Sequence, residues 1–81
     1  MARFWYASIV TENDGSWYGQ FKTKRERDEF CERDGVWVLR NMHRDWHGNV
    51  TGTRERVPAR IFPTTAAAVR SNMSKSVQTY W

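Results

Sequence analysis

The chain has 81 residues, a length that allows one domain near the smallest size whose core is stable without metals or disulfides. Its net charge is +4, and ten of its thirteen basic residues are arginine. Cys31 is the only cysteine, which excludes an internal disulfide and favours a reducing compartment. No apolar run approaches the roughly 20 residues of a membrane span, and the N-terminus lacks a secretory pattern. We therefore expect a soluble cytoplasmic protein with no membrane partner.

Aromatic residues dominate the apolar composition. The chain has five Trp, three Tyr and four Phe, but only one Leu and two Ile. Each ring can bury about 150–250 Å², so a few rings suffice for a small core. We expect the remaining rings to lie on the surface with the arginines, where a cluster would mark a binding site. The alternative is a plain basic domain whose charges only solvate its surface.

The first part of the chain predicts a β-hairpin. Residues Arg3–Thr11 are rich in aromatic and β-branched side chains, and both faces are apolar, as in the central strand of a sheet. Asn13-Asp14-Gly15 is typical of a tight turn. Ser16–Phe21 then returns as a second, antiparallel strand.

A short polar helix follows, from Lys24 to about Arg33. Thr23 stands at the N-cap and Glu26 three residues later, the spacing of a capping box. Gly35 is placed to end the helix in a left-handed conformation. Because the helix has few apolar positions, we expect it to lay Phe30 on the sheet and to expose its charges.

The second half of the chain repeats this order. Val36–Arg44 predicts a third strand and Val50–Val57 a fourth, which Pro58 ends or places at a sheet edge because it has no N–H to donate. Thr64 or Thr65 then caps a second short helix over residues 66–70, with Asn72 as its end.

The predicted fold is α+β, with an antiparallel four-stranded sheet and two short helices in the order ββαββα. Residues 1–73 form the single domain. Residues 74–81 form a tail that is either frayed or adds a last strand on the sheet or on a partner.

Chemical motifs are weak. His43 and His47 flank Asp45, but zinc sites use tight Cys or His pairs, and a spacing of four at a strand end does not set two histidines on one face. Cys31 is expected to be a small buried hydrophobe rather than a nucleophile. The sequence shows no paired carboxylates, phosphate-binding glycine loop or serine elbow. We therefore predict a protein that is not an enzyme and uses no metal or cofactor.

The hairpin of the third and fourth strands carries four arginines whose faces depend on the strand register: Arg40, Arg44, Arg54 and Arg56. A two-residue loop at His47-Gly48 pairs Arg40 with Glu55 and Arg44 with Thr51, and leaves the other two arginines on the opposite face. A three-residue loop places all four on one face. Directly opposed like charges are unfavourable, so the first register is intrinsically preferred. The second would indicate binding to phosphates or to an acidic partner.

The segment Trp17-x-Gly19-x-Phe21-x-Thr23-x-x-Glu26 resembles the strand-to-helix junction of plant ethylene-response-type and phage-integrase N-terminal DNA-binding domains. The resemblance implies a protein that reads the DNA major groove with a sheet. It covers only a short part of the chain, and one strand precedes the junction where that family has two.

A second resemblance involves the start of the first helix, at Phe21, Thr23, Lys24, Glu26, Arg27 and Asp28. The pattern is similar to small orphan proteins of phages and mobile elements, anti-CRISPR proteins among them. The resemblance implies a non-catalytic protein of the host cytoplasm that inhibits a host defence complex stoichiometrically through exposed side chains.

Together these features predict a non-enzymatic inhibitor that binds a host protein or nucleoprotein such as a CRISPR effector. Trp, Tyr and Arg dominate the energetics of protein interfaces, so we expect the binding residues to be Tyr18, Arg40, Arg44, Trp46, Arg54 and Arg56. The alternative is direct binding of DNA or RNA through the same residues. A structural or virion component is a third possibility.

Overall fold

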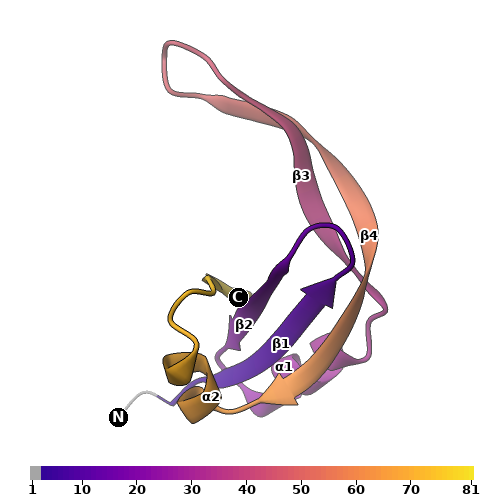
Figure 1. Cartoon of the computed structure of the whole chain (residues 1–81), viewed down its shortest axis with the longest axis vertical. Coiled ribbons are helices and arrows are strands. Elements are labelled where there is room, and N and C mark those ends of the chain that lie inside the picture. The colour runs from indigo at the N-terminus through magenta and orange to yellow at the C-terminus, as the bar shows by residue number, and fades with distance from the viewer. Residues whose placement is uncertain (1–2) are drawn as a thin grey trace.

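The computed structural model describes residues 3–81, and its elements follow the chain in the order β1 (Trp5–Thr11), β2 (Ser16–Phe21), α1 (Lys24–Cys31), β3 (Gly35–Arg44), β4 (Val50–Thr64), α2 (Ala66–Ser71) and β5 (Val77–Thr79). The strands form one curled sheet in the order β3-β4-β1-β2-β5 (Figure 1). β1 pairs antiparallel with both β2 and β4, and β3 pairs antiparallel with β4. β5 pairs parallel with β2.

The prediction of an antiparallel four-stranded sheet is wrong, because the sheet is mixed and has a fifth strand. Tyr18 lies beside Val77, and the Tyr18 N–H donates to the carbonyl of Ser76 at 2.9 Å. At the other end of the pair, the Tyr80 N–H donates to the carbonyl of Gln20 at 3.0 Å. The chain passes through α2 before it returns, and such a crossover allows parallel pairing. Of the two alternatives for the tail, the ordered strand is the one that the structure contains.

The first hairpin and α1 follow their local chemistry. β2 has the predicted bounds, and the Thr23 hydroxyl accepts from the Glu26 N–H at 3.2 Å, which confirms the N-cap. The role predicted for Gly35 is wrong, since the helix already ends at Cys31 and Gly35 opens β3. The reason for a glycine there is space: a Cβ on Gly35 would lie 2.8 Å from the carbonyl oxygen of Val57.

β4 is longer than predicted and runs through Pro58 to Thr64. Pro58 lies opposite Gly35 at the end of the pairing with β3, and Ala59 begins the pairing with β1. The strand changes neighbours at this point, so the missing N–H of the proline interrupts neither ladder.

An aromatic core covers the inner face of the sheet. Ala7, Ile9 and Phe21 are at most 2% exposed. The ring centroid of Phe30 from α1 lies 5.2 Å from that of Phe21 and 4.7 Å from that of Tyr80. β1 is therefore central, as predicted, and the C-terminal segment is part of the core.

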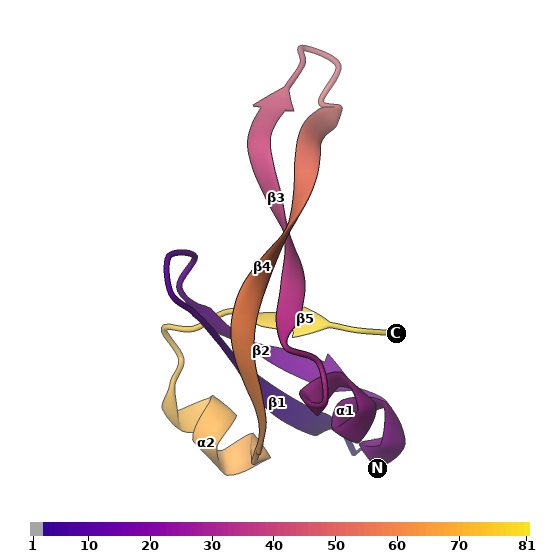
Figure 2. The ribbon, with the colours of Figure 1, turned by 90° about the vertical axis from the view of Figure 1, so that its right-hand side faces the viewer.

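The outer part of the β3–β4 hairpin projects from this body (Figures 1 and 2). Val36 and Val57 face each other and are the last buried pair of the hairpin. We call the hairpin beyond this pair, residues 37–56, the arm. Within the arm only Val38 and Arg40 are partly buried, and all other side chains are exposed.

Candidate binding surface on the arm

The arm contains a β-bulge that changes its register. Leu39 pairs with Arg54 and Arg40 with Thr53, but the next pairs are His43 with Thr51 and Arg44 with Val50. The β3 side therefore carries one extra residue. The outer pairs have the register of the predicted three-residue loop, but the bulge ends that register before Arg40, so neither predicted register holds along the whole arm.

The bulge decides which arginines share a face. Arg40 remains on the face of Glu55, and its Nε donates to the Glu55 carboxylate at 2.8 Å. Arg44 pairs with Val50, so it lies on the face of the alternate residues Arg54 and Arg56 instead. A bulge re-aims the side chains that follow it, and here it gathers three of the four arginines on one face.

Two residues permit the bulge. Asn41 has a positive φ of 51°, a conformation that Asn tolerates better than most residues. Gly52 lies across from it, and a Cβ there would come within 2.9 Å of the Arg40 carbonyl oxygen. The sequence alternation alone contains no signal for this feature.

The tip of the arm is a turn built on Asp45. Its Oδ1 accepts from the N–H groups of His47 and Asn49, each at 2.9 Å, and Gly48 has a φ of 87°. This hydrogen bonding explains Asp45 as a turn residue. The Trp46 side chain is left 89% exposed, with the His47 ring centroid 3.9 Å from its own.

The arginines of the arm fall into two groups. Arg40 donates to both carboxylate oxygens of Asp14, and its hydrogen bonds to Glu55 and to Asp14 raise the pKa of Arg40. This residue therefore ties the base of the arm to the β1–β2 turn. Arg56 donates to Asp34 at 2.7 Å. Arg44 and Arg54 form no ion pair with any residue in the part of the chain that the structure describes.

Tyr18 does not belong to this surface. It is only 4% exposed, its hydroxyl accepts from the Asn72 side chain at 3.0 Å, and the Lys75 ammonium lies 5.4 Å from its ring centroid. The segment that follows α2 covers the outer face of β2, and the sequence prediction did not place that segment.

Three exposed apolar residues of β3 were missing from the predicted binding residues: Trp37, Leu39 and Met42. Trp37 is 61% exposed and Leu39 is 46% exposed, and they alternate with Val36 and Val38, which point to the core side. The alternation was a usable signal. Of residues 36–39, only Val36 and Val38 pack in or against the small core.

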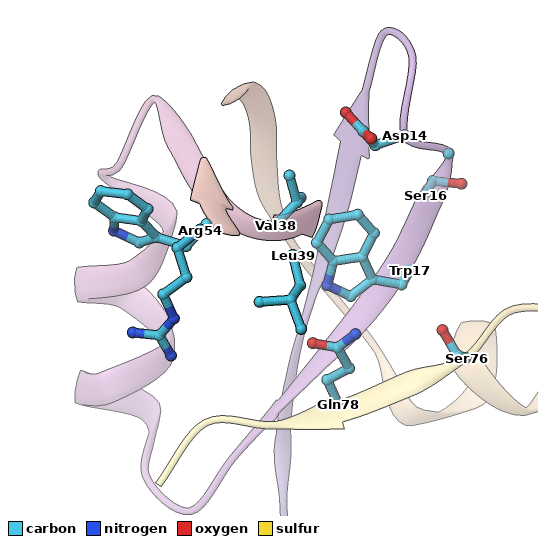
Figure 3. A pocket seen from close by; sticks show the side chains of 10 residues that line it. Asp14, Ser16, Trp17, Val38, Leu39, Arg54, Ser76 and Gln78 are labelled. Atoms are coloured by element: carbon cyan, nitrogen blue, oxygen red, sulfur yellow. The ribbon is translucent and has the colours of Figure 1, made fainter. Parts of the chain in front are cut away.

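A cleft of about 520 Å³ separates the base of the arm from the body. Figure 3 shows Leu39 and Arg54 from the arm and Trp17 and Gln78 from the body around it. The exposed surface of the arm therefore continues into a concave region at its base.

The remaining candidate groups lie elsewhere. Burial raises the pKa of the Cys31 thiol, which disfavours the nucleophilic thiolate. Neither helix within residues 3–81 has the length and apolar composition that crossing a bilayer requires.

No family model, curated protein or solved structure matches the chain.

Proposed function

We propose that the protein is a non-enzymatic inhibitor of phage or mobile-element type that binds a host nucleoprotein defence complex, such as a CRISPR effector, in the cytoplasm. The observation that carries the proposal is the composition of the arm. Trp37 and Trp46 are 61% and 89% exposed on a projecting element that also bears Arg44, which has no ion pair among residues 3–81. A large exposed ring contributes to the free energy of binding when a partner buries it. Trp and Arg are among the residue types that dominate interface energetics.

The shape of the arm supports a protein partner. Two strands form a narrow ribbon that enters a groove more readily than a broad sheet face does. β3 is also an edge strand of the sheet, so its outer edge has no neighbouring strand within residues 3–81. Such an edge can add to the sheet of a partner by main-chain hydrogen bonds, while the side chains supply specificity.

The test uses immobilised protein in nuclease-treated host lysate, with Trp46→Ala as the arm variant. Arg60→Gln is the matched control, because Arg60 is an exposed arginine of β4 outside the arm. Wild type and control are expected to capture the same protein partner, and Trp46→Ala should lose at least tenfold in affinity.

The captured complex is then tested for inhibition. With a purified effector as the partner, cleavage of its target DNA should fall linearly as inhibitor is added. Cleavage should cease at one inhibitor per effector. Capture that is unaffected by Trp46→Ala, or cleavage that continues at saturating inhibitor, would contradict the proposal.

A second candidate function is direct binding of DNA or RNA. The observation that favours it is the shared face of Arg44 and Arg54, neither of which has an acidic partner within residues 3–81. A two-stranded ribbon also fits the DNA major groove. In this case affinity should fall by about 0.9 log units per phosphate contact for each log unit of salt. The double variant Arg44→Gln, Arg54→Gln should reduce that slope, and nuclease treatment should abolish capture from lysate.

A further inference from the structure

A second concave site lies at the end of the sheet opposite the arm, where β1 begins and β4 ends. It has a volume of about 440 Å³ and is lined by residues from the N-terminal segment, α1, the end of β4 and α2. We propose that this pocket binds the phosphate group of a small phosphate ester. The proposal is independent of the arm and of the function assigned to it.

Three arginines from three separate segments line the pocket: Arg3, Arg27 and Arg70. None of the lining residues is acidic. Arg3 and Arg70 form no ion pair with any other residue described by the structure. Like charges around one cavity repel each other, so an anion placed between them is stabilised by all three.

Arg27 is the fixed member of this cluster. It is only 8% exposed, its Nε donates to Asp28 at 2.8 Å, and its Nη1 lies 3.4 Å from the Tyr6 carbonyl oxygen. These two contacts orient the guanidinium group before any ligand arrives.

Trp5 helps to hold the cluster together. The guanidinium carbon of Arg27 lies 5.5 Å from the Trp5 ring centroid, and that of Arg3 lies 5.9 Å from it. Both distances are within the range of a cation–π contact. The aromatic ring thus contacts two of the three cations.

The chemistry of the cluster favours phosphate over carboxylate. A guanidinium fork binds two oxygens of an oxyanion side by side. A phosphate monoester offers three terminal oxygens and up to two negative charges, whereas a carboxylate offers two oxygens and one charge. The cavity also falls in the size range of small-molecule sites, about 300–1,000 Å³, which leaves room for the group that the phosphate is attached to.

The test is an NMR titration at constant ionic strength that follows the indole N–H signal of Trp5. The probes are inorganic phosphate, adenosine monophosphate and adenosine. Both phosphates are expected to shift the signal with saturation, and adenosine should leave it unchanged. Tighter binding of the nucleotide than of inorganic phosphate would identify an ester as the ligand, and the reverse order would identify the free ion.

Exposed arginines provide the variants, so loss of folding does not confuse the result. Arg3→Gln and Arg70→Gln should each weaken phosphate binding about tenfold, since each removes a charged hydrogen-bond donor. Arg60→Gln removes the same charge outside the pocket and should change the affinity less than twofold. Equal weakening by all three variants, or equal shifts with adenosine and its monophosphate, would overturn the proposal.

Discussion

The two ends of β4 lie in opposite surroundings. Residues 59–64 pair with β1, and Ile61 packs against the core, whereas residues 50–56 have only β3 beside them and are all exposed. An isolated two-stranded hairpin is marginally stable in water. The arm therefore depends on its continuity with the five-stranded body and on the contact between Arg40 and Asp14 at its base.

The two ends of β4 therefore have different expected roles: the end paired with β1 stabilises the fold, and the end in the arm is proposed to bind a partner. The body buries rings from α1, β2 and the C-terminal segment, and hence determines the free energy of unfolding. The arm buries almost nothing and displays Trp46 together with Arg44 and Arg54, which form no ion pair within the described residues 3–81. Substitutions in the two regions should therefore affect different measurements.

The largest loss of unfolding free energy is expected from a substitution in the body. Phe21→Ala removes a ring that is 2% exposed and contacts two other aromatic rings. Such substitutions cost about 3–5 kcal/mol of unfolding free energy, a large share of the stability of a domain this small. Chemical denaturation followed by tryptophan fluorescence measures the loss. A change below about 1 kcal/mol would show that the core does not lie where the structure places it.

A smaller loss of unfolding free energy is expected from a substitution in the C-terminal segment. Tyr80→Phe deletes the hydroxyl that accepts from Trp17 Nε1 at 2.9 Å and leaves this indole N–H without that partner. The expected cost is about 1–3 kcal/mol in the same denaturation experiment. Wild-type stability in this variant would mean that the segment after β5 contributes nothing to the body.

The pKa of Tyr80 predicts that the unfolding free energy depends on pH. Burial raises the pKa of Tyr80 above its usual value of 10.0, although the hydrogen bond from Trp17 partly opposes this shift. The neutral phenol is favoured in the folded state, so its contribution is complete below pH 10.0 and is lost as the pH rises through the folded pKa. Urea denaturation between pH 8 and about 11 should show a steeper alkaline loss in wild type than in Tyr80→Phe.

The smallest effect on stability is expected at the bulge. Gly52→Ala places a Cβ within 2.9 Å of the Arg40 carbonyl oxygen and should shift the strand pairing of the arm. Cross-strand NOEs between Arg44 and Val50 should then disappear, while the unfolding free energy changes by less than about 1 kcal/mol. Retention of these NOEs would show that the bulge does not need a glycine.

Local patterns predicted much of the body. The first hairpin and the cap at Thr23 follow from short-range chemistry, and the structure confirms them. Of the two residues predicted to cap the second helix, Thr64 and Thr65, the structure has Thr65. Two features depend on distant parts of the chain. β5 forms on β2, which also buries Tyr18, and Pro58 is tolerated because β4 exchanges neighbours there.

The position of the six expected residues in the fold was predictable in part, and their binding of a partner stays a prediction. Five of the six expected residues lie on the arm, where Trp46 is 89% exposed. Their grouping depends on the bulge at Asn41, which simple alternation does not contain. Pairing with carboxylates also depends on tertiary structure, since Asp14 and Asp34 come from other segments.

Removal of the outer arm tests the central claim most directly. Arg40 and Thr53 face each other, so Asn-Gly in place of residues 41–52 should close the shortened hairpin as a two-residue turn. We expect this variant to keep the unfolding free energy within about 1 kcal/mol of wild type and to lose capture of the partner. Global unfolding of the variant, or undiminished capture by a folded one, would contradict the separation of body and arm.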